Sequence, residues 1–412
     1  MRITCVGGGP AGLYFAVLAK LADPGHEVTV LERNPAGVTY GWGVVFWDDL
    51  LDDLFRHDPV SARRISDAAY RWDEYEVRAA GKPVTHLAGY GFSLGRHRLL
   101  SLLAERAVEL GVDVRYSLSS SAEADISDAD LVVACDGAGS RIRERDAAHF
   151  GAEVETGRNK YIWLGTPHVF RTFTFGFERT TAGWIWFHAY PFADGASTFI
   201  VECTPETWTG LGLDRLDGPA GADLLGRIFA GHLGGHPLVD QRAGGGWLNF
   251  RRVTNRRWDS GNVALMGDAA HTTHFAIGSG TKLAMQDAMA LADAIAGGGD
   301  LAAALERYEH RRKAALAPLQ KAARASSEWF ERMPEYADLP AKRFSYALSN
   351  RRGEYPLWRY LLHVTTQRRV PRTALRWALS LRRWSRARRR PSLGGAFRGG
   401  AQHFGGPAHV GR

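Results

Sequence analysis

The sequence predicts an α/β protein in which a Rossmann-like dinucleotide-binding domain is interrupted by an antiparallel β-sheet and followed by helices. Three observations support this fold class. A Gly-rich turn, Gly7–Gly12, follows a strand-like start, and a second strand-and-glycine motif, Val263–Asp268, appears far downstream. Between them, aromatic and β-branched runs such as Phe170–Phe177 are typical of antiparallel strands. We therefore expect a nucleotide-binding domain that the chain leaves and re-enters.

The N-terminal segment has the pattern of a βαβ unit. Residues 2–7 read as a buried strand, a helical pattern follows from Ala11 to about Leu21, and Glu27–Glu32 reads as a second strand. The first glycine of the turn permits a tight bend, the second lets a pyrophosphate approach the backbone, and the third allows close helix–strand packing. Glu32 is placed to accept hydrogen bonds from a ribose 2′-hydroxyl. This unit predicts dinucleotide binding.

The rest of the chain divides into further patterns and no internal repeat. In chain order they are a helix over 97–110, strands over 112–116 and 129–135, a sheet region over 158–250 interrupted by a helix at 220–232, a strand over 263–266, a helix from 280 and helices over 301–335. The expected domains are a nucleotide-binding domain (1–75, 93–155 and 255–335), a substrate-binding sheet domain (76–92 and 156–254), a C-terminal helical extension (336–390) and a disordered Gly-rich tail (391–412).

Composition indicates a globular protein. The chain has 412 residues, and its 45% hydrophobic and 23% charged content is ordinary for a soluble domain. No uncharged apolar run approaches the ~20 residues that span a membrane, and no signal peptide precedes the first strand. The three cysteines, Cys5, Cys135 and Cys203, lie in apolar strand-like runs and read as buried thiols. We expect a cytoplasmic protein without a transmembrane segment.

The net charge of +8 originates in the C-terminal region. No Asp or Glu follows Glu354, whereas 13 arginines lie between Arg359 and Arg412. The first 354 residues carry 39 basic and 44 acidic side chains, so the body lacks the footprint of a nucleic-acid-binding domain. Three interpretations of the tail stay open: a solvated helical face with a disordered end, a site for the phosphates of a CoA or carrier-protein thioester, and non-specific contact with nucleic acid or anionic membrane.

Two further motifs resemble those of one enzyme family. Asp136–Arg143 (DGAGSRIR) follows a buried strand and resembles the DGxxSxxR segment of flavin-dependent aromatic hydroxylases, although a strand-end Asp-Gly alone is also a common turn. Gly267–Ala284 (GDAAHTTHFAIGSGTKLA) resembles the third signature of the same family. The resemblance implies that the dinucleotide is FAD in a GR2-type domain. It also implies that the Asp136 segment packs beside the FAD pyrophosphate and is associated with NAD(P)H binding.

The resemblance also implies roles within the third motif. Asp268 holds the ribityl chain, and the turn Gly278–Thr281 presents amides at the pyrimidine edge of the isoalloxazine. A helix N-terminus there favours the negative charge of the reduced flavin. The chain departs from the family's pattern in having His274 and Phe275 where prolines are common, and Lys282 where Asn is common. These differences predict a differently shaped flavin face towards the substrate.

Longer strings narrow the resemblance to one subgroup. They are Gly41–Phe46, Arg158–Thr166, Thr198–Glu202, Trp247–Phe250 and His274–Lys282. The strings look like the class A subgroup of salicylyl-CoA 5-hydroxylase and the monooxygenase domain of anthraniloyl-CoA monooxygenase, and more distantly like the violacein-pathway tryptophan hydroxylase. The resemblance is nearly continuous from the first residue to about residue 331. It implies that NAD(P)H reduces FAD, that O2 adds to the reduced flavin, and that a C4a-hydroperoxide hydroxylates an electron-rich aromatic ring.

Site residues follow from the motifs and the resemblance. The residues expected to bind FAD are Gly7, Gly9, Pro10, Ala11, Gly12, Glu32, Arg33, Trp42, Gly43, Val44, Arg98, Asp136, Gly137, Gly267, Asp268, Gly278, Ser279, Gly280 and Thr281. The residues expected to contact substrate are Tyr161, Trp163, Trp186 and Phe275, with plain core packing as the alternative for each aromatic side chain. His274 and His188 are candidate bases for a phenol or aniline proton, although an activated ring needs little help. No metal site is expected, because no third ligand has suitable spacing to His271 and His274.

These features predict an FAD- and NAD(P)H-dependent aromatic monooxygenase that uses O2. The first hypothesis is an aryl-CoA substrate such as salicylyl-CoA, hydroxylated para to its hydroxyl group (5-hydroxylation). Two alternatives stay open: the same chemistry on a free indole or aryl natural-product intermediate, and a non-hydroxylating FAD reductase or FAD-binding protein. The strings Trp42–Phe46 and Arg158–Thr166 argue against the last of these. The expected partner is a small aromatic molecule, with no specific nucleic acid, and the expected state is a monomer or homodimer.

Overall fold

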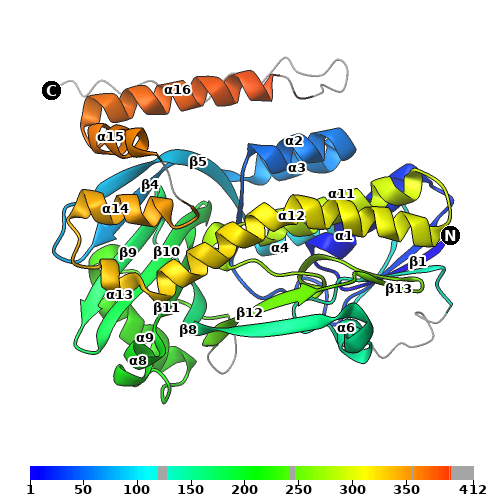
Figure 1. Ribbon diagram of the computed structural model, residues 1–412, viewed down its shortest axis with the longest axis horizontal. Helices are drawn as coiled ribbons and strands as arrows, with labels where there is room; N and C mark the ends of the chain where they lie inside the picture. The colour runs from blue at the N-terminus through cyan, green and yellow to red at the C-terminus, as the bar shows by residue number, and fades with distance from the viewer. Residues whose placement is uncertain (119–127, 242–245, 354–355, 389, 391–412) are drawn as a thin grey trace.

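The computed structural model describes residues 1–118, 128–241, 246–353, 356–388 and 390. Two β-sheets lie side by side along the length of the molecule, and helices cover them (Figure 1). The predicted α/β class, with a Rossmann-like domain, an antiparallel sheet and C-terminal helices, is confirmed. Among the described helices, none combines the length and the apolar character that crossing a bilayer requires.

The first sheet carries the nucleotide-binding motifs. Its six strands have the order β13-β14-β7-β1-β2-β6. Their bounds are β1 (Arg2–Val6), β2 (Glu27–Leu31), β6 (Asp113–Arg115), β7 (Leu131–Ala134), β13 (Asp259–Ser260) and β14 (Val263–Leu265). Neighbouring strands are parallel, apart from the β13–β14 pair. Because Val263 of β14 pairs with Val132 of β7, the chain returns to this sheet after building the second one.

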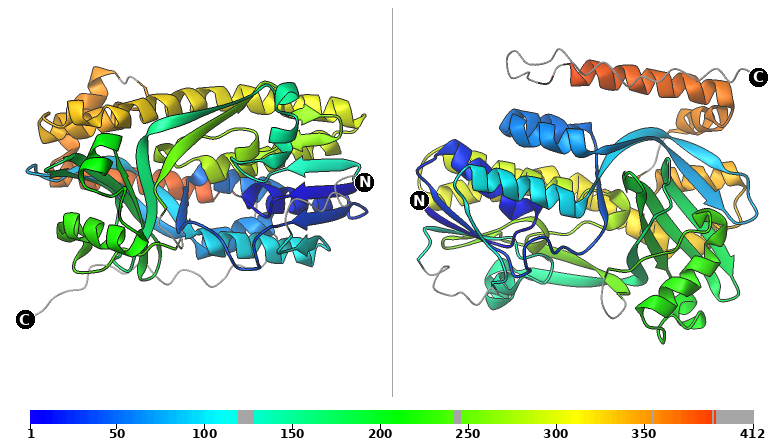
Figure 2. Two further views of the ribbon diagram at one scale, coloured as in Figure 1. Left: turned by 90° about the horizontal axis from the view of Figure 1, so that it is seen from below. Right: turned by 180° about the vertical axis from the view of Figure 1, so that it is seen from behind.

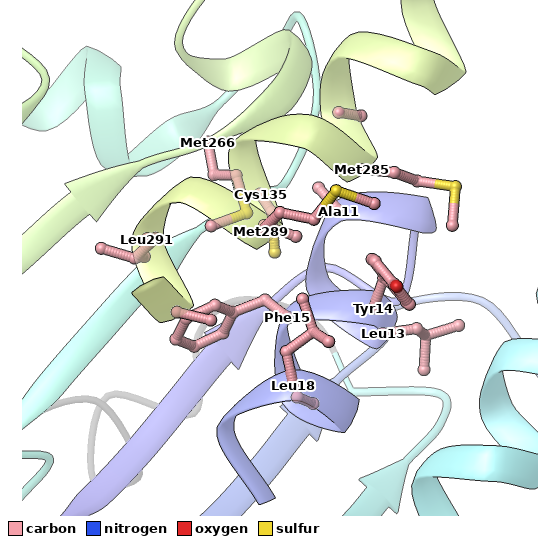
Figure 3. Packing of buried hydrophobic residues seen from close by; sticks show 14 of the residues in the cluster. Ala11, Leu13, Tyr14, Phe15, Leu18, Cys135, Met266, Met285, Met289 and Leu291 are labelled. Atoms are coloured by element: carbon pink, nitrogen blue, oxygen red, sulfur yellow. The ribbon is translucent and has the colours of Figure 1, made fainter. Parts of the chain in front are cut away.

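Two helices that follow the glycine motifs pack together against the first sheet (Figure 3). They are α1 (Pro10–Ala22) and α11 (Gly280–Ala296). Phe15 of α1 and Met289 of α11 belong to one buried cluster with Cys135, which directly follows β7. The three cysteines are buried and unpaired. Contact between α1 and α11 brings together two motifs that lie far apart in the sequence.

The second sheet has eight strands in the order β12-β8-β11-β10-β9-β4-β5-β3. Their bounds are β3 (Gly43–Phe46), β4 (Tyr70–Ala79), β5 (Thr85–Gly95), β8 (Ala152–Thr166), β9 (Phe173–Thr180), β10 (Gly183–Ala193), β11 (Ala196–Cys203) and β12 (Leu248–Asn255). All neighbours are antiparallel except β4 and β9.

Side chains alternate between the two faces of the second sheet. Phe187 of β10 packs in a core with α9 (Gly218–Ile228) and α10 (Ala230–Leu233). Trp186 faces a second cluster with Phe330 of α12 (Leu301–Glu331). This second face carries the candidate site.

The second sheet extends beyond the limits expected for the sheet domain. β3 lies within the range 1–75 that was expected for the nucleotide-binding domain, yet Val45 pairs with Ser93 of β5. β4 begins at Tyr70, also inside that range. A short strand such as β3 takes its sheet from a partner distant in sequence, so local patterns contain little information about its domain.

The remaining helices frame these sheets. They are α2 (Asp48–His57), α3 (Pro59–Ala68), α4 (Arg96–Glu109), α6 (Arg141–Arg145), α7 (Ala147–Phe150), α8 (Pro205–Gly210), the 3₁₀ turns η1 (Gly267–Ala269) and η2 (Phe275–Ile277), α13 (Met333–Tyr336), α14 (Ala341–Asn350), α15 (Leu357–Thr366) and α16 (Arg369–Ala387).

The Arg-rich helix α16 lies across the outside of the molecule, above β5 and α2 (Figures 1 and 2). Arg376 Nη1 lies 3.6 Å from Glu74 Oε1, and Arg383 Nη1 lies 3.5 Å from Asp73 Oδ1. Acidic side chains of the body therefore compensate part of the positive charge of this helix. Residues 391–412, for which disorder is predicted, fall outside the described residues.

Candidate active site

A first cavity lies at the carboxyl end of the parallel strands, where α/β folds bind nucleotides. We call it the nucleotide cavity. It has a volume of about 320 Å³, and its lining includes Gly7, Gly8, Gly9, Glu32, Arg33, Asp136 and Gly137. Pro10, Ala11 and Gly12 are buried just below this lining, in the first turn of α1.

The glycines of the turn have different constraints. A Cβ on Gly12 would lie 2.2 Å from the Gly7 carbonyl oxygen and 2.7 Å from Cys135 Sγ, so helix–strand packing requires this glycine. A Cβ on Gly9 would meet no atom of the described residues within 4 Å. Gly9 is also the N-cap of α1, and its helix start has no side-chain cap. An open approach to an uncapped helix N-terminus suits a pyrophosphate.

Two carboxylates border the nucleotide cavity. Glu32 accepts hydrogen bonds from the backbone amides of Gly8 and Asn34, each at 2.8 Å, and from Asn34 Nδ2 at 2.7 Å, so the lone pair that remains on Oε2 suits a ribose hydroxyl. Asp136 accepts from the Arg141 amide at 2.9 Å through Oδ2. Its Oδ1 is buried without a partner among the described residues, as expected where a ligand supplies the donor.

Arg143 connects the two glycine motifs. This buried residue of α6 donates to the carbonyl oxygens of Ala138 at 2.7 Å and of Ala269 at 3.0 Å. Ser140 caps α6 by accepting from the Arg143 amide. The DGxxSxxR segment contains Ser140 and Arg143, but its sequence alone indicates no role for either residue. The structure shows that Arg143 holds this segment against η1.

A buried ionic network supports the turn at Gly267. Asp287 of α11 accepts from the Gly267 amide at 3.1 Å and lies 2.8 Å from His271 Nε2, while Arg312 of α12 donates to it at 2.6 Å. Burial alone would raise the pKa of Asp287, but His271 and Arg312 outweigh burial and lower it. Sequence analysis missed Asp287 and Arg312, because only the packing of α11 on α12 brings them to the motif.

A second cavity, which we call the aromatic cavity, adjoins the first. It has a volume of about 390 Å³, and its lining includes Asp268, the turn Gly278–Thr281 and aromatic side chains of the second sheet. Arg96 lines both cavities. Burial lowers the pKa of Arg96, and the opposing attraction of Asp268 and Glu32 places this cation between an acid of each cavity. The two cavities together suit an extended dinucleotide with a ring system at one end.

The far end of the aromatic cavity has the features expected beside a flavin ring. Ser279 is the N-cap of α11 without a side-chain cap, so the first amides of this helix are available to a ligand. Desolvation raises the pKa of Asp268, while His271 and Arg96 act in the opposite direction. Gly43 and Val44 also line this cavity. The residues present therefore fit FAD, with Asp268 and Gly278–Thr281 at its flavin end.

The wall of the aromatic cavity is formed by rings. Tyr161 and Phe275 have ring centroids 4.7 Å apart, and His188 lies edge-on to Phe275 at 5.7 Å. Trp163 lines the cavity as well. The rings are tilted against one another, with interplanar angles of 40° for Tyr161–Phe275 and 70° for His188–Phe275, and they form a largely apolar wall for an aromatic substrate.

A fully buried carboxylate, Glu202, stands behind this wall. It accepts from Asn159 Nδ2 at 2.8 Å and from Trp186 Nε1 at 3.0 Å, and it lies 3.7 Å from His188 Nε2. Burial alone would raise the pKa of Glu202, but His188, His274 and Asn159 outweigh burial and lower it. Burial also lowers the pKa of His188, against the attraction of Glu202. A neutral imidazole beside an ionised carboxylate can accept a proton and be stabilised as the cation.

Several predicted site residues lie outside the linings of both cavities. Trp42 packs against Gly165 and Phe192, and Trp186 lies behind the wall as a donor to Glu202. Gly267 is buried beneath Asp268. His274 lines a separate cavity between β12 and α12.

Arg98, predicted to bind FAD, lies on the exposed side of α4 and pairs with Glu105 at 3.7 Å. Arg96, two residues earlier, points to the cavities instead, because its position at the start of α4 is directed towards the strand ends. The sequence contains no local signal that distinguishes these two arginines.

The C-terminal extension contributes two arginines that sequence analysis missed. Arg351 and Arg352 line the aromatic cavity. Arg351 donates to Ser326 Oγ and to the carbonyl oxygen of Ala276, and its guanidinium lies 5.3 Å from the centroid of Phe175. Arg352 Nε is buried without a partner among the described residues.

Comparisons with known proteins agree with this geometry. A family model described as FAD binding domain matches residues 229–323, and one described as Lycopene cyclase protein matches residues 3–152. Salicyloyl-CoA 5-hydroxylase from Streptomyces sp is 41% identical, over 82% of this chain and 66% of that protein. The chain thus spans just under two thirds of the length of that relative.

Two further relatives align along almost their whole length. The 3-hydroxy-4-methyl-anthranilyl-[aryl-carrier protein] 5-monooxygenase of Streptosporangium sibiricum is 37% identical, over 88% of this chain and 97% of that protein. Protodeoxyviolaceinate monooxygenase of Chromobacterium violaceum is 32% identical, over 86% and 96%.

Solved structures share the fold. The tetrameric form of 2-methyl-3-hydroxypyridine-5-carboxylic acid oxygenase has a TM-score of 0.63 at 19% identity, over 85% of this chain and 95% of that one. PqsL of P. aeruginosa in complex with 2-aminobenzoylacetate also has a TM-score of 0.63 at 19% identity, over 85% and 99%. The predicted resemblance, enzyme class and cofactors are confirmed. The chain belongs to the class A FAD-dependent aromatic monooxygenases, which use NAD(P)H and O2.

Proposed function

We propose that the protein hydroxylates the ring of an aromatic acyl group carried as a thioester, with 5-hydroxylation of salicyloyl-CoA as the first candidate. The names of two relatives support this substrate class, since one acts on salicyloyl-CoA and the other on an anthranilyl group on an aryl-carrier protein. The observation that carries the proposal is a single cavity lined by an aromatic wall, by a histidine with a buried glutamate behind it, and by an arginine whose Nε has no partner among the described residues.

FAD, when bound and reduced by NAD(P)H, supplies the activation of O2 and the transfer of one oxygen atom to the ring. The chain's residues hold and orient the reactants. Tyr161 and Phe275, which contact each other, would together flank one side of the substrate ring, and the apolar lining around them would exclude water from the reaction. The uncapped start of α11 would stabilise negative charge at the flavin edge.

His188 is the proposed acceptor of the phenol or aniline proton. Its Nε2 is directed to Glu202, which leaves Nδ1 as the nitrogen that can accept a proton from the substrate. Loss of that proton makes the ring more electron-rich and so more reactive towards oxygen transfer. Glu202 would stabilise the imidazolium that results, in the manner of a buried carboxylate that orients a catalytic histidine. Glu202 is thus a positioning residue.

Arg352 is the feature that favours an acyl substrate over an unsubstituted indole. Its Nη2 lies 3.4 Å from the carbonyl oxygens of Ala276 and Ile277, so these contacts are weak, and its Nε has no partner among the described residues. A buried guanidinium N–H in a largely apolar cavity suits the carbonyl oxygen of an acyl group.

A substrate panel tests the proposal. Purified FAD-loaded protein is incubated with O2 and NAD(P)H and with salicyloyl-CoA, anthraniloyl-CoA, the two free acids or indole, and products are identified by mass. We expect hydroxylated product from a thioester at a rate at least about tenfold above the free acids, which corresponds to ~1.4 kcal/mol. Hydroxylation of indole alone would favour a free indole or aryl intermediate as the substrate. NAD(P)H oxidation without any hydroxylated product would favour a non-hydroxylating enzyme. The cytoplasmic location and the monomeric or homodimeric state stay predictions.

A further inference from the structure

A third cavity lies between β12 and α12, next to the aromatic cavity. Its volume is about 290 Å³, and it shares Phe250, Thr272 and Thr273 with the lining of the aromatic cavity. From α12 it takes Gln320, Lys321, Arg324 and Ser327, which are spaced so that they fall on one side of the helix. Arg252 of β12 faces them. We call this space the cationic cavity.

The described residues that line the cationic cavity include three cations and no carboxylate. Arg252 is paired with Glu155, whose side chain is 59% exposed and lies outside the lining. Lys321 and Arg324 have neither an ion pair nor a hydrogen bond among the described residues. This differs from α16, where Arg376 and Arg383 are paired with acids of the body. Uncompensated positive charge in a concave site favours an anionic ligand.

The same cavity has neutral hydrogen-bond donors. His274 lines it, and its Nδ1 accepts from the Ala276 amide at 3.3 Å, so the ring proton lies on Nε2. The Ser327 hydroxyl is a further donor in the lining. Two flexible cations with neutral donors beside them match the several oxygens of a diphosphate better than a single carboxylate.

We propose that the cationic cavity binds the diphosphate of a ligand that reacts in the aromatic cavity. The FAD pyrophosphate is accounted for by the Gly-rich turn in the nucleotide cavity. Two other reactants carry a diphosphate: NAD(P)H, which the family uses, and the CoA portion of the proposed substrate. The first source is independent of the proposed function, whereas the second rests on it. Either ligand would extend past Phe250 and Thr272–Thr273, which border both cavities.

The test is the double substitution Lys321→Gln and Arg324→Gln in the full-length FAD-loaded protein. Both side chains are exposed and make no hydrogen bond among the described residues, so FAD content and Tm should stay at wild-type values. In one arm, anaerobic bleaching of the flavin is followed as a function of NADPH and NADH concentration, with no need for the true aromatic substrate. In the other arm, the KM for salicyloyl-CoA is measured at saturating NAD(P)H. Inorganic pyrophosphate is tested as a competitor in both.

We expect the half-saturating concentration of one diphosphate ligand to rise at least about tenfold in the variant. Added salt should also reduce the affinity for this ligand less in the variant than in the wild type, because fewer charge contacts are left to be screened. A change with NAD(P)H alone identifies the nicotinamide dinucleotide as the occupant, and a change with salicyloyl-CoA alone identifies the thioester. Arg311→Gln is the matched control, because Arg311 lies on the same helix, is paired with Asp293 and lies outside the cavity lining.

Half-saturating concentrations within twofold of wild type for both ligands, with unchanged inhibition by pyrophosphate, would overturn the proposal. If no thioester is hydroxylated by the wild type, the proposed substrate class fails, but the NAD(P)H arm still decides whether the cationic cavity binds a diphosphate. The two proposals can therefore fail separately.

Discussion

The nucleotide cavity and the aromatic cavity adjoin at Arg96, but they are built in opposite ways. The part of the nucleotide cavity that adjoins α1 is formed by backbone: a glycine turn, strand ends and a helix N-terminus. The aromatic cavity is formed mainly by side chains, and these come from strands and helices as distant in sequence as Tyr161 and Arg352. The difference teaches that cofactor binding depends on the absence of side chains, whereas substrate choice depends on their identity. Substitutions at the glycines of the nucleotide cavity should therefore abolish FAD binding. Substitutions in the aromatic cavity should instead change substrate affinity and turnover by degrees.

The largest effect is expected from Gly9→Val. A Cβ at this position would meet no described protein atom within 4 Å, so we expect the fold to tolerate valine, whose side chain occupies the open approach to the start of α1. We expect FAD affinity to fall at least about 100-fold, which corresponds to ~2.7 kcal/mol. The measurement is the flavin absorbance of the purified protein together with the circular dichroism spectrum of the apoprotein.

Two other glycines sharpen this result. Gly12→Val should lower the free energy of unfolding itself, because its Cβ collides with the Gly7 carbonyl at 2.2 Å. Gly226→Ala, near the C-terminal end of α9, places its Cβ more than 4 Å from the described atoms outside its own helix; it should leave FAD affinity unchanged and raise the free energy of unfolding by at most ~1 kcal/mol, since alanine favours a helix over glycine. Wild-type FAD affinity in Gly9→Val would show that the turn is not the approach route of the pyrophosphate.

A smaller but still large effect is expected from His188→Gln in the aromatic cavity. Loss of the proposed base should lower kcat about 100-fold for a phenolic substrate while FAD stays bound. Glu202→Gln is the matched variant. Burial lowers the pKa of His188 and Glu202 opposes this, so removal of the carboxylate should move the acidic limb of the kcat profile to lower pH. A pH profile that is the same in all three proteins would contradict the assignment.

The part of the site that is encoded locally could be predicted from the sequence. The turn at Gly7–Gly12 and the segments at Asp136 and Gly267 each combine a buried strand with glycines, and the structure places all three around adjoining cavities. The sequence indicates Glu202 only as the last residue of the string Thr198–Glu202, because its function follows from its neighbours Asn159 and Trp186 rather than from its own segment.

Side chains at the ends of helices were the hardest to place. Arg98 was expected at the cofactor and Arg96 was not, since the two differ only in their direction from the start of α4. Arg352 lies in an extension whose packing against the sheet has no local motif. Sequence periodicity identifies which face of a helix is buried, but it does not identify which distant residue that face meets.

Acidification should lower the free energy of unfolding by about 2 kcal/mol through the titration of His274. Burial lowers its pKa from 6.5 to about 4. Between these values the unfolded chain binds a proton that the folded chain does not, so the free energy of unfolding decreases as the pH falls from 6.5 towards 4. From pH 7.5 to pH 5 this amounts to about 2 kcal/mol.

The measurement is urea unfolding at pH 7.5 and pH 5, compared between the wild type and His274→Asn. The Asn side chain keeps an acceptor for the Ala276 amide but cannot titrate, so the pH dependence should shrink in the variant. An equal loss of stability in both proteins would assign the acid sensitivity to other groups.

The smallest effect is expected from Arg352→Met, and it tests substrate choice most directly. The variant keeps the volume and the apolar stem of the side chain but removes the unpartnered N–H, so the KM for an aryl thioester should rise about tenfold, or ~1.4 kcal/mol. Arg352→Lys should recover part of the loss, because it restores a cationic donor without the planar geometry. An aromatic ring without an acyl group should be unaffected by either change. If instead the KM values of both ring types rise together, Arg352 supports the shape of the turn at Ala276 and Ile277 rather than recognising an acyl oxygen. A selective effect would place acyl recognition in the C-terminal extension, beyond residue 323, where the match to the FAD binding domain ends.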